Sequence, residues 1–186
     1  VDTRPKGNRK YTFIFPAFPR VFKNFELIGK AAELLQNAGY HDVRFLLTFA
    51  GTENRYARWI KERFKNVRSL EFIGAQTRKR VFELYSEADC LIFPSLLETW
   101  GLPITEFRRF NKPILAVDLL YAHETGNQYK KIRFFDPKYP EALASLIKET
   151  AAGHVRFEPC NNPAPPFPYV TDWESLFDLL LDADAE

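Results

Sequence analysis

Two glutamates in one short stretch carry the strongest chemical signal in the sequence. Glu98 and Glu106 stand on either side of a Gly-Leu-Pro turn that follows the apolar run at 90–93. Pro103 suits the first turn of a helix, where its missing N–H costs nothing. The N–H groups of such a turn favour an anion such as phosphate, and a carboxylate accepts hydrogen bonds from hydroxyl groups. A ligand that carries both phosphate and hydroxyl groups would therefore suit this stretch.

A second short stretch supplies positive charge. Arg20 and Lys23 follow the apolar segment at 11–15 and stand just before Asn24, a residue type that often caps helices. Two cations that face a helix N-terminus would neutralise a diphosphate without a metal ion. The three histidines are far apart and show no spacing typical of metal ligands, so we expect no metal site: His41, His123 and His154.

Short apolar segments alternate with segments of helical spacing along most of the chain. This alternation predicts an α/β fold with a doubly wound, Rossmann-like parallel sheet flanked by helices. The strands are predicted at 11–15, 43–50, 70–73, 90–94, 113–117 and 132–135. Helices are predicted to begin near Asn24, Thr52 or Glu53, Thr77, Pro103 and Pro140, and a long polar loop is predicted at 118–126.

The predicted fold indicates where a ligand would bind, because open parallel sheets bind ligands beyond the carboxyl ends of their strands. The loops at that edge are predicted at 16–23, 74–77, 95–106 and 118–126. Arg20, Lys23 and both glutamates are therefore expected at one edge of the sheet. We interpret Arg78 as a helix-surface residue and Asn24 as a helix cap rather than a ligand contact.

The bulk composition limits the class of protein. The chain has 186 residues, 46% of them apolar and 16% aromatic, which is enough for one well-buried domain. Its net charge of +2 argues against a nucleic-acid partner held by the overall field. Cys90 and Cys160 form no disulfide framework, and no stretch has the length and apolarity of a membrane span or signal peptide. We expect a reducing, cytoplasmic location.

The sequence predicts four parts. Residues 1–10 form a loose N-terminal segment, 11–153 the main domain, 154–170 a proline-rich linker and 171–186 a C-terminal helix. The last helix opens on Thr-Asp-Trp-Glu, which has the form of a capping box. The chain contains no Met, not even an initiator, so we expect it to be an excised piece of a longer protein.

The residues from Glu98 to Glu106 resemble the Glu, seven residues, Glu signature of the retaining glycosyltransferases of family 4 (glycosyl transferases group 1), which have the two-domain GT-B fold. Phe-Ile-Gly at 72–74, Leu-Tyr at 84–85 and Lys-Pro-Ile-Leu-Ala at 112–116 are similar to that family as well. The resemblance covers residues 11–151. It implies the C-terminal domain of such an enzyme, which binds the nucleotide-sugar donor.

The resemblance also implies a role for each matching residue. Arg20 and Lys23 would hold the diphosphate, and Glu106 would bind the ribose hydroxyls. Glu98, the candidate catalytic residue, would contact the donor sugar. The remaining contacts would come from Gly74 in the base pocket and from the backbone N–H groups of Trp100, Gly101 and Leu102 beside the sugar and the distal phosphate.

For the whole protein, the resemblance implies a hexosyltransferase that moves a sugar from a UDP- or GDP-linked donor with retention of configuration. The product would be a polysaccharide, lipopolysaccharide or other glycoconjugate. A glycan or lipid-linked acceptor would bind an N-terminal domain outside this sequence, to which the last helix would cross back, and the chain alone would be inactive. The full protein would be cytoplasmic or peripheral at the inner face of a membrane. No metal and no cofactor besides the nucleotide-sugar co-substrate is expected.

Two alternatives stay open from the sequence: a non-catalytic nucleotide-binding module, and half of a GT-B sugar-nucleotide epimerase. Taken singly, Glu106 is an ordinary first-turn acid that stabilises a helix dipole, and Glu98 is a solvated loop acid. A binding module has no reason to keep both carboxylates together with the basic loop at 20–23. This combination favours the enzyme.

Overall fold

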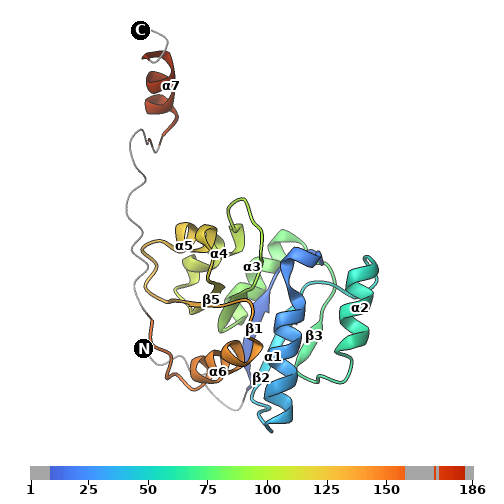
Figure 1. The fold of residues 1–186 in the computed structure, drawn as a ribbon. Helices are drawn as coiled ribbons and strands as arrows, with labels where there is room; N and C mark the ends of the chain where they lie inside the picture. The colour runs from blue at the N-terminus through green and yellow to red at the C-terminus, as the bar shows by residue number, and fades with distance from the viewer. Residues whose placement is uncertain (1–8, 158–169, 171, 183–186) are drawn as a thin grey trace.

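The computed structural model describes residues 9–157, 170 and 172–182. Its centre is one six-stranded parallel sheet with the order β3-β2-β1-β4-β5-β6 (Figure 1). This architecture confirms the predicted doubly wound, Rossmann-like fold. The strands are β1 (Tyr11–Phe15), β2 (Val43–Leu47), β3 (Leu70–Phe72), β4 (Cys90–Phe93), β5 (Ile114–Val117) and β6 (Ile132–Phe135).

Helices cover both faces of the sheet, as expected when right-handed crossovers join parallel strands. Those described are α1 (Phe25–Asn37), α2 (Arg55–Arg63), α3 (Arg78–Glu87), α4 (Leu102–Phe107), α5 (Leu120–Gly126), α6 (Pro140–Ala151) and α7 (Trp173–Asp182), with 3-10 turns at Val21–Lys23 and Arg108–Phe110. α1 and α6 lie side by side over one face (Figure 1), and the crossovers through α3 and α4 run over the other.

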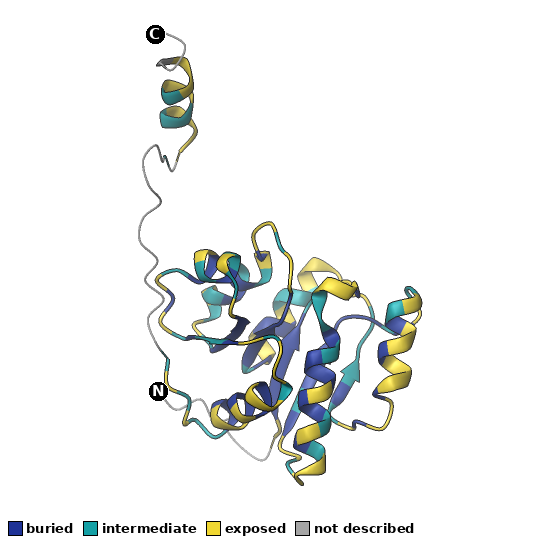
Figure 2. Cartoon of the chain, in the orientation of Figure 1, coloured by how far each residue is buried: buried dark blue, intermediate teal, exposed yellow. Residues whose placement is uncertain are grey.

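The core is rich in aromatic rings, which explains the high aromatic content of the sequence. Strands β1, β4 and β5 are buried at every position, whereas the outer faces of the helices are exposed (Figure 2). Phe15 lies at the centre of the sheet, 4.7 Å from the ring of Phe25 and 5.5 Å from that of Phe93. Parallel sheets are buried on both faces and need such continuous apolar strands.

Two helix starts differ from the sequence prediction in detail. α2 begins at Arg55 rather than at residue 52 or 53, because the side chain of Asn54 caps it by accepting from Ala57 N–H at 2.8 Å. Glu53 instead folds back, and its carboxylate accepts from the N–H groups of residues 50–52. Asn24 holds the cap position of α1 as predicted, but through a left-handed backbone (φ 54°) and without a side-chain bond.

The predicted polar loop at 118–126 is wrong, since Leu120–Gly126 form α5. The segment has only a weak local preference for a helix, and packing against the rest of the domain stabilises the helical conformation. Ala122, Thr125 and Gly126 are buried, and a β-carbon at Gly126 would lie 2.7 Å from Cδ1 of Ile132. A glycine inside a helix is normally unfavourable, but here it lets the end of α5 lie close to the side chain of Ile132 in β6.

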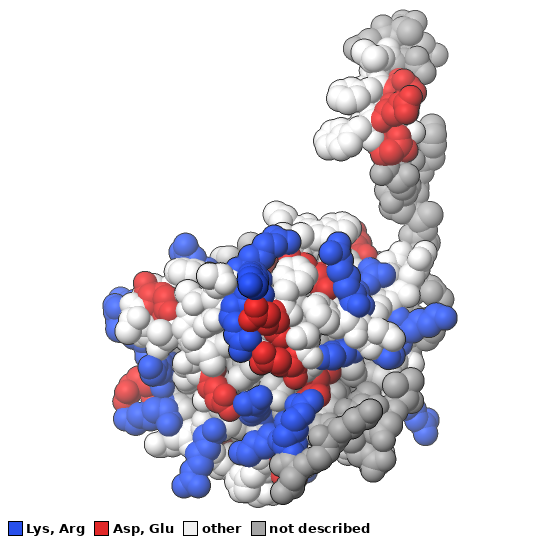
Figure 3. Space-filling model, turned by 180° about the vertical axis from the view of Figure 1, so that it is seen from behind, with Lys and Arg blue, Asp and Glu red and all other residues white. Residues whose placement is uncertain are grey.

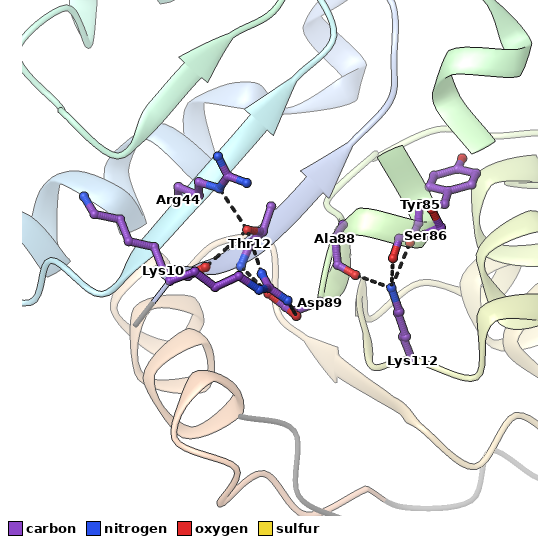
Figure 4. Close-up of polar contacts among 9 residues, drawn as sticks. Lys10, Thr12, Arg44, Tyr85, Ser86, Ala88, Asp89 and Lys112 are labelled. Carbon is purple, nitrogen blue, oxygen red and sulfur yellow. Dashed lines mark hydrogen bonds and ion pairs between the residues drawn. The ribbon is translucent and has the colours of Figure 1, made fainter. Parts of the chain in front are cut away.

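A polar cluster ties together the amino edge of the sheet (Figure 4). The carboxylate of Asp89 accepts hydrogen bonds from Nη1 and Nη2 of Arg9 and, at 2.8 Å, from the N–H of Thr12 in β1. The ammonium of Lys112 donates to the carbonyls at the end of α3, at 3.1 Å, 2.6 Å and 2.6 Å from those of residues 85, 86 and 88. Burial lowers the pKa of Lys112. These contacts fix α3 and β1 at the edge opposite the predicted binding loops.

Four tyrosines that are buried or partly buried lead us to expect that the protein loses stability in alkali. Burial raises the pKa of Tyr129 to about 12, and burial with a nearby carboxylate raises the pKa of Tyr56, Tyr85 and Tyr121 still more. Above about pH 10 the unfolded chain loses these protons while the folded chain keeps them. The folded state then binds more protons, so the free energy of unfolding should fall as the pH rises.

Urea unfolding followed at a series of pH values, with tyrosinate absorbance recorded in parallel, checks this expectation. Tyr129→Phe removes one of the four ionisations and should make the fall less steep. A free energy of unfolding that stays constant above about pH 10 would contradict the assignment.

Beyond the main domain, the structure describes residues 154–157, 170 and 172–182, so most of the predicted linker at 154–170 lies outside the described residues. The first residue of the predicted capping box, at 171, lies outside the described residues; the side chain of Asp172 accepts from Ser175 N–H at 2.9 Å. α7 exposes Trp173 and Phe177, and its acidic side chains line one side (Figure 3). On the face shown there, basic and acidic residues of the main domain are interspersed. None of the described helices has the length and apolarity to cross a membrane.

Candidate functional site

The two stretches that stand out in the sequence meet where the strand order reverses. β1 lies between β2 and β4, so the loops that leave β1 and β4 emerge side by side at the carboxyl edge. The N–H of Leu96 donates to the carbonyl oxygen of Phe22 at 2.7 Å and joins the two loops directly. Open parallel sheets bind ligands at such a reversal.

Lys23 and Glu98 form an ion pair across this junction. Lys23 ends the 3-10 turn just before α1, and Glu98 lies in the loop after β4. Their side chains are only 18% and 14% exposed, so both charges are largely shielded from water. An ammonium group has three N–H donors, so Lys23 can bind a second anion while it contacts Glu98.

Glu106 belongs to a second group of contacts, on α4 and α3. One carboxylate oxygen accepts from Nη2 of Arg78 at 3.0 Å, and the other accepts from the hydroxyl of Tyr85 at 3.3 Å. The sequence predicts Arg78 to be a helix-surface residue. Its side chain is indeed 78% exposed, but it also reaches the glutamate, whose side chain is 16% exposed.

These three side chains line a cavity of about 480 Å³ at the carboxyl edge. Its walls come from the loops after β1 and β3 and from α3 and α4, with Thr48 after β2. This is the volume of a small-molecule site. The other lining residues are Pro16, Ala17, Phe18, Ala75, Gln76, Val81, Leu102 and Pro103.

The turn before α4 presents backbone donors. Gly101 adopts a left-handed conformation with φ 82°, which glycine tolerates best. Within the described part of the chain, no group accepts a hydrogen bond from the N–H of Trp100, Gly101 or Leu102. Such N–H groups suit an anionic ligand.

The turn is held in place from both sides. Nε1 of the Trp100 indole donates to Oγ1 of Thr105 at 2.9 Å. The hydroxyl of Thr125 on α5 lies in hydrogen-bond contact with the carbonyl of Trp100. The helix that the sequence did not predict therefore supports the loop that the sequence singled out.

Arg20 and Gly74 lie at the margins of the cavity. The guanidinium of Arg20 stacks over the ring of Phe18, 5.2 Å from its centroid, and is exposed. Gly74 has φ 75° and does not line the cavity itself, whereas its neighbours Ala75 and Gln76 do. The amide of Gln76 folds this loop by donating to the carbonyl of residue 73 at 2.7 Å.

The sequence prediction missed two polar residues of the cavity wall, Thr48 and Tyr85, whereas Gln76 lies in the predicted binding loop at 74–77. Helical spacing after Thr77 predicts that Tyr85 lies on the apolar face of its helix, and its ring is indeed buried. That spacing does not tell which group the hydroxyl of Tyr85 contacts. Thr48 stands at the end of β2 and holds the first loop, since its Oγ1 accepts from Ala17 N–H at 3.0 Å. The sequence predicts Thr48 inside a strand at 43–50, but β2 ends at Leu47 and leaves Thr48 at the carboxyl edge.

Exposed apolar side chains surround the charged groups. Most of the exposed large apolar residues outside α7 stand on the carboxyl-edge loops or at the starts of α4 and α5. We call them the apolar rim: Phe18, Val21, Phe22, Leu96, Leu97, Trp100, Leu102 and Leu120. An exposed apolar patch of this kind marks a surface that contacts something else. Over the described residues, no group of three or more His, Cys, Asp or Glu side chains is placed to hold a metal ion.

A family comparison finds one match. The family model described as "Glycosyl transferases group 1" matches residues 2–154. A search of curated proteins finds no match.

Solved structures share the fold. A glycosyltransferase from Rickettsia africae ESF-5 is 20% identical, with a TM-score of 0.66 over 80% of this chain and 41% of that one. Sucrose-phosphate synthase from Thermosynechococcus elongatus is 17% identical, with a TM-score of 0.62 over 78% and 38% of the two chains. Anabaena HepE, solved in complex with UDP, is 18% identical, with a TM-score of 0.63 over 78% and 41%. This chain thus spans less than half the length of these neighbours.

Proposed function

Because the chain belongs to the glycosyl transferases group 1 family, we propose that it is the donor-binding domain of a retaining, family 4 glycosyltransferase that uses a nucleoside diphosphate-sugar. The observation that carries the proposal is the junction of the loops after β1 and β4. It combines the Lys23 and Glu98 pair with the N–H donors of residues 100–102, from which no described group accepts, beside a cavity lined by Glu106.

In the proposed complex each charged group binds a different part of the nucleoside diphosphate-sugar. Lys23, assisted by Arg20 and by the N–H groups of the turn before α4, binds the diphosphate. Glu106 accepts the ribose hydroxyls inside the cavity, and the loop at 74–76 borders the base. Glu98 faces the donor sugar beside Lys23, as expected of the catalytic residue.

The same groups act on the reaction. When the bond between sugar and diphosphate breaks, negative charge develops on the phosphate that leaves. Lys23 and fixed N–H donors stabilise that charge at little cost in reorganisation. The proposed mechanism needs no metal ion, since these cations and dipoles replace one, and no cofactor besides the co-substrate.

For the full-length protein we propose a hexosyltransferase of glycoconjugate synthesis, such as polysaccharide or lipopolysaccharide. A glycan or lipid-linked acceptor is held by a separate N-terminal domain, and without that domain this chain binds donor but does not transfer the sugar. The proposed location is cytoplasmic or peripheral at the inner face of a membrane. The UDP bound to the Anabaena neighbour supports the choice of a nucleoside diphosphate as ligand.

Calorimetry with UDP and GDP tests the proposal. One of the two should bind, and Glu106→Gln should weaken it about tenfold, because a hydrogen bond to a charged group contributes about 1.5–3 kcal/mol. Glu83→Gln is the control, since Glu83 also pairs with an arginine of α3 but does not line the cavity. If neither nucleotide binds, the proposed function is wrong.

A further inference from the structure

Glu106 is held by two donors of very different character. The hydroxyl of Tyr85 donates a hydrogen bond to one carboxylate oxygen, and the guanidinium of Arg78 donates one to the other. Arg78 is 78% exposed, and an ion pair with so exposed a partner contributes little to fixing a side chain. Tyr85 is completely buried.

The ring of Tyr85 is fixed by aromatic neighbours on three elements. It lies 5.6 Å from Phe82 on its own helix, 5.3 Å from Phe107 on α4 and 5.8 Å from Phe110 in the following turn. Edge-to-face contacts of this kind add to the burial of the rings. The hydroxyl group is therefore presented from a rigid base.

The hydroxyl of Tyr85 acts as a donor toward Glu106. Burial, and then the charge of Glu106, raise the pKa of Tyr85 well above its ordinary value. The group thus keeps its proton at any working pH, and a carboxylate can only accept from it.

The acceptor capacity of Glu106 matches a ribose. An ionised carboxylate offers about four lone-pair sites on its two oxygens. The bonds from Tyr85 and Arg78 use one site on each oxygen. About two sites are left. Glu106 lines the cavity, and a ribose presents two neighbouring hydroxyls.

We propose that Tyr85 is a positioning residue, which aims the carboxylate of Glu106 at the ribose hydroxyls and thereby makes the site select ribonucleotides over 2′-deoxyribonucleotides. This inference rests on the proposed function, which assigns the ribose to Glu106. Tyr85 acts through the orientation of the carboxylate.

The test measures a ratio of affinities. Calorimetry gives the dissociation constants of UDP and 2′-deoxy-UDP, or of the GDP pair if the protein binds guanine nucleotides, for the wild type and Tyr85→Phe. In the wild type the ribonucleotide should bind about tenfold more tightly, since one hydrogen bond to a charged group is lost with the 2′-hydroxyl. In Tyr85→Phe the ratio should fall to about threefold or less, mainly through weaker binding of the ribonucleotide.

Tyr129→Phe is the matched control. Tyr129 is another buried tyrosine, and its hydroxyl donates to the carbonyl of Lys112 at 2.6 Å, away from the cavity. It should lower thermal stability about as much as Tyr85→Phe but leave the affinity ratio of the wild type unchanged. This outcome would distinguish an orienting effect of Tyr85 on the Glu106 carboxylate from a merely structural role.

Each outcome has a distinct meaning. A wild type that discriminates and a folded Tyr85→Phe that keeps the full ratio would overturn the role of Tyr85 alone. A wild type that binds the ribonucleotide and the 2′-deoxyribonucleotide with equal affinity would overturn the selection for ribose and the role of Glu106. A wild type that binds no nucleotide would overturn the proposed function and this inference with it.

Discussion

Replacing Lys23 with alanine should weaken the binding of UDP or GDP about 100-fold, which corresponds to about 3 kcal/mol. Two effects act in the same direction. The diphosphate loses a charge-assisted hydrogen bond in a site largely shielded from water. Glu98, now without its partner, adds a negative charge beside the phosphates. Calorimetry at constant ionic strength measures the loss.

Lys30→Ala is the control for this experiment. This substitution also removes one positive charge, here from α1. Lys30 is exposed, however, and does not contact Glu98 or Glu106. The affinity should change by less than about twofold, because the charge lies in solvent. Equal affinities for Lys23→Ala and the wild type would refute the assignment of Lys23 to the diphosphate.

Replacing Asp89 with alanine should cost about 2–3 kcal/mol of stability and leave nucleotide binding almost unchanged. The substitution leaves the N–H of Thr12 and the guanidinium of Arg9 without their acceptor at the amino edge (Figure 4). The side chain of Asp89 is only 12% exposed, whereas Arg9 is 45% exposed and regains water, which keeps the loss moderate. The melting temperature should fall by about 4–12 °C.

Glu62→Ala provides the comparison for Asp89→Ala. Glu62 also forms an ion pair, with Lys65, but both side chains are mostly exposed. Its removal should change stability by less than about 0.5 kcal/mol. If Asp89→Ala has an equally small effect in thermal unfolding, the cluster at the amino edge does not stabilise the fold as argued.

The strands and the binding edge could be predicted from the sequence because their causes are local. Continuous apolar runs such as Cys90–Phe93 favour buried parallel strands, and the alternation with helices implies crossovers of one hand. The loop that follows each strand is then assigned to the carboxyl edge. This reasoning brought Lys23 and Glu98 to the same edge, where the structure pairs them.

The partners of Glu106 could not be predicted in this way. Helical spacing correctly placed the ring of Tyr85 against the core, but spacing does not tell which element the hydroxyl meets. That depends on how closely α3 and α4 approach each other after crossing the sheet. α5 was missed for a similar reason, since its stability comes from the contacts of Thr125 and Gly126 with distant residues rather than from local propensity.

The apolar rim has a consequence for how the site responds to salt. While the carboxyl edge is open to water, ions screen its charges, so donor affinity should fall as ionic strength rises. A partner surface that covers Val21, Leu97 and Leu120 would exclude water and lower the local dielectric constant around Lys23. Each charge in the site would then act more strongly on the leaving diphosphate, and dissolved ions would have little influence. The apolar rim would thus determine how strongly the charged side chains of the site stabilise the leaving diphosphate.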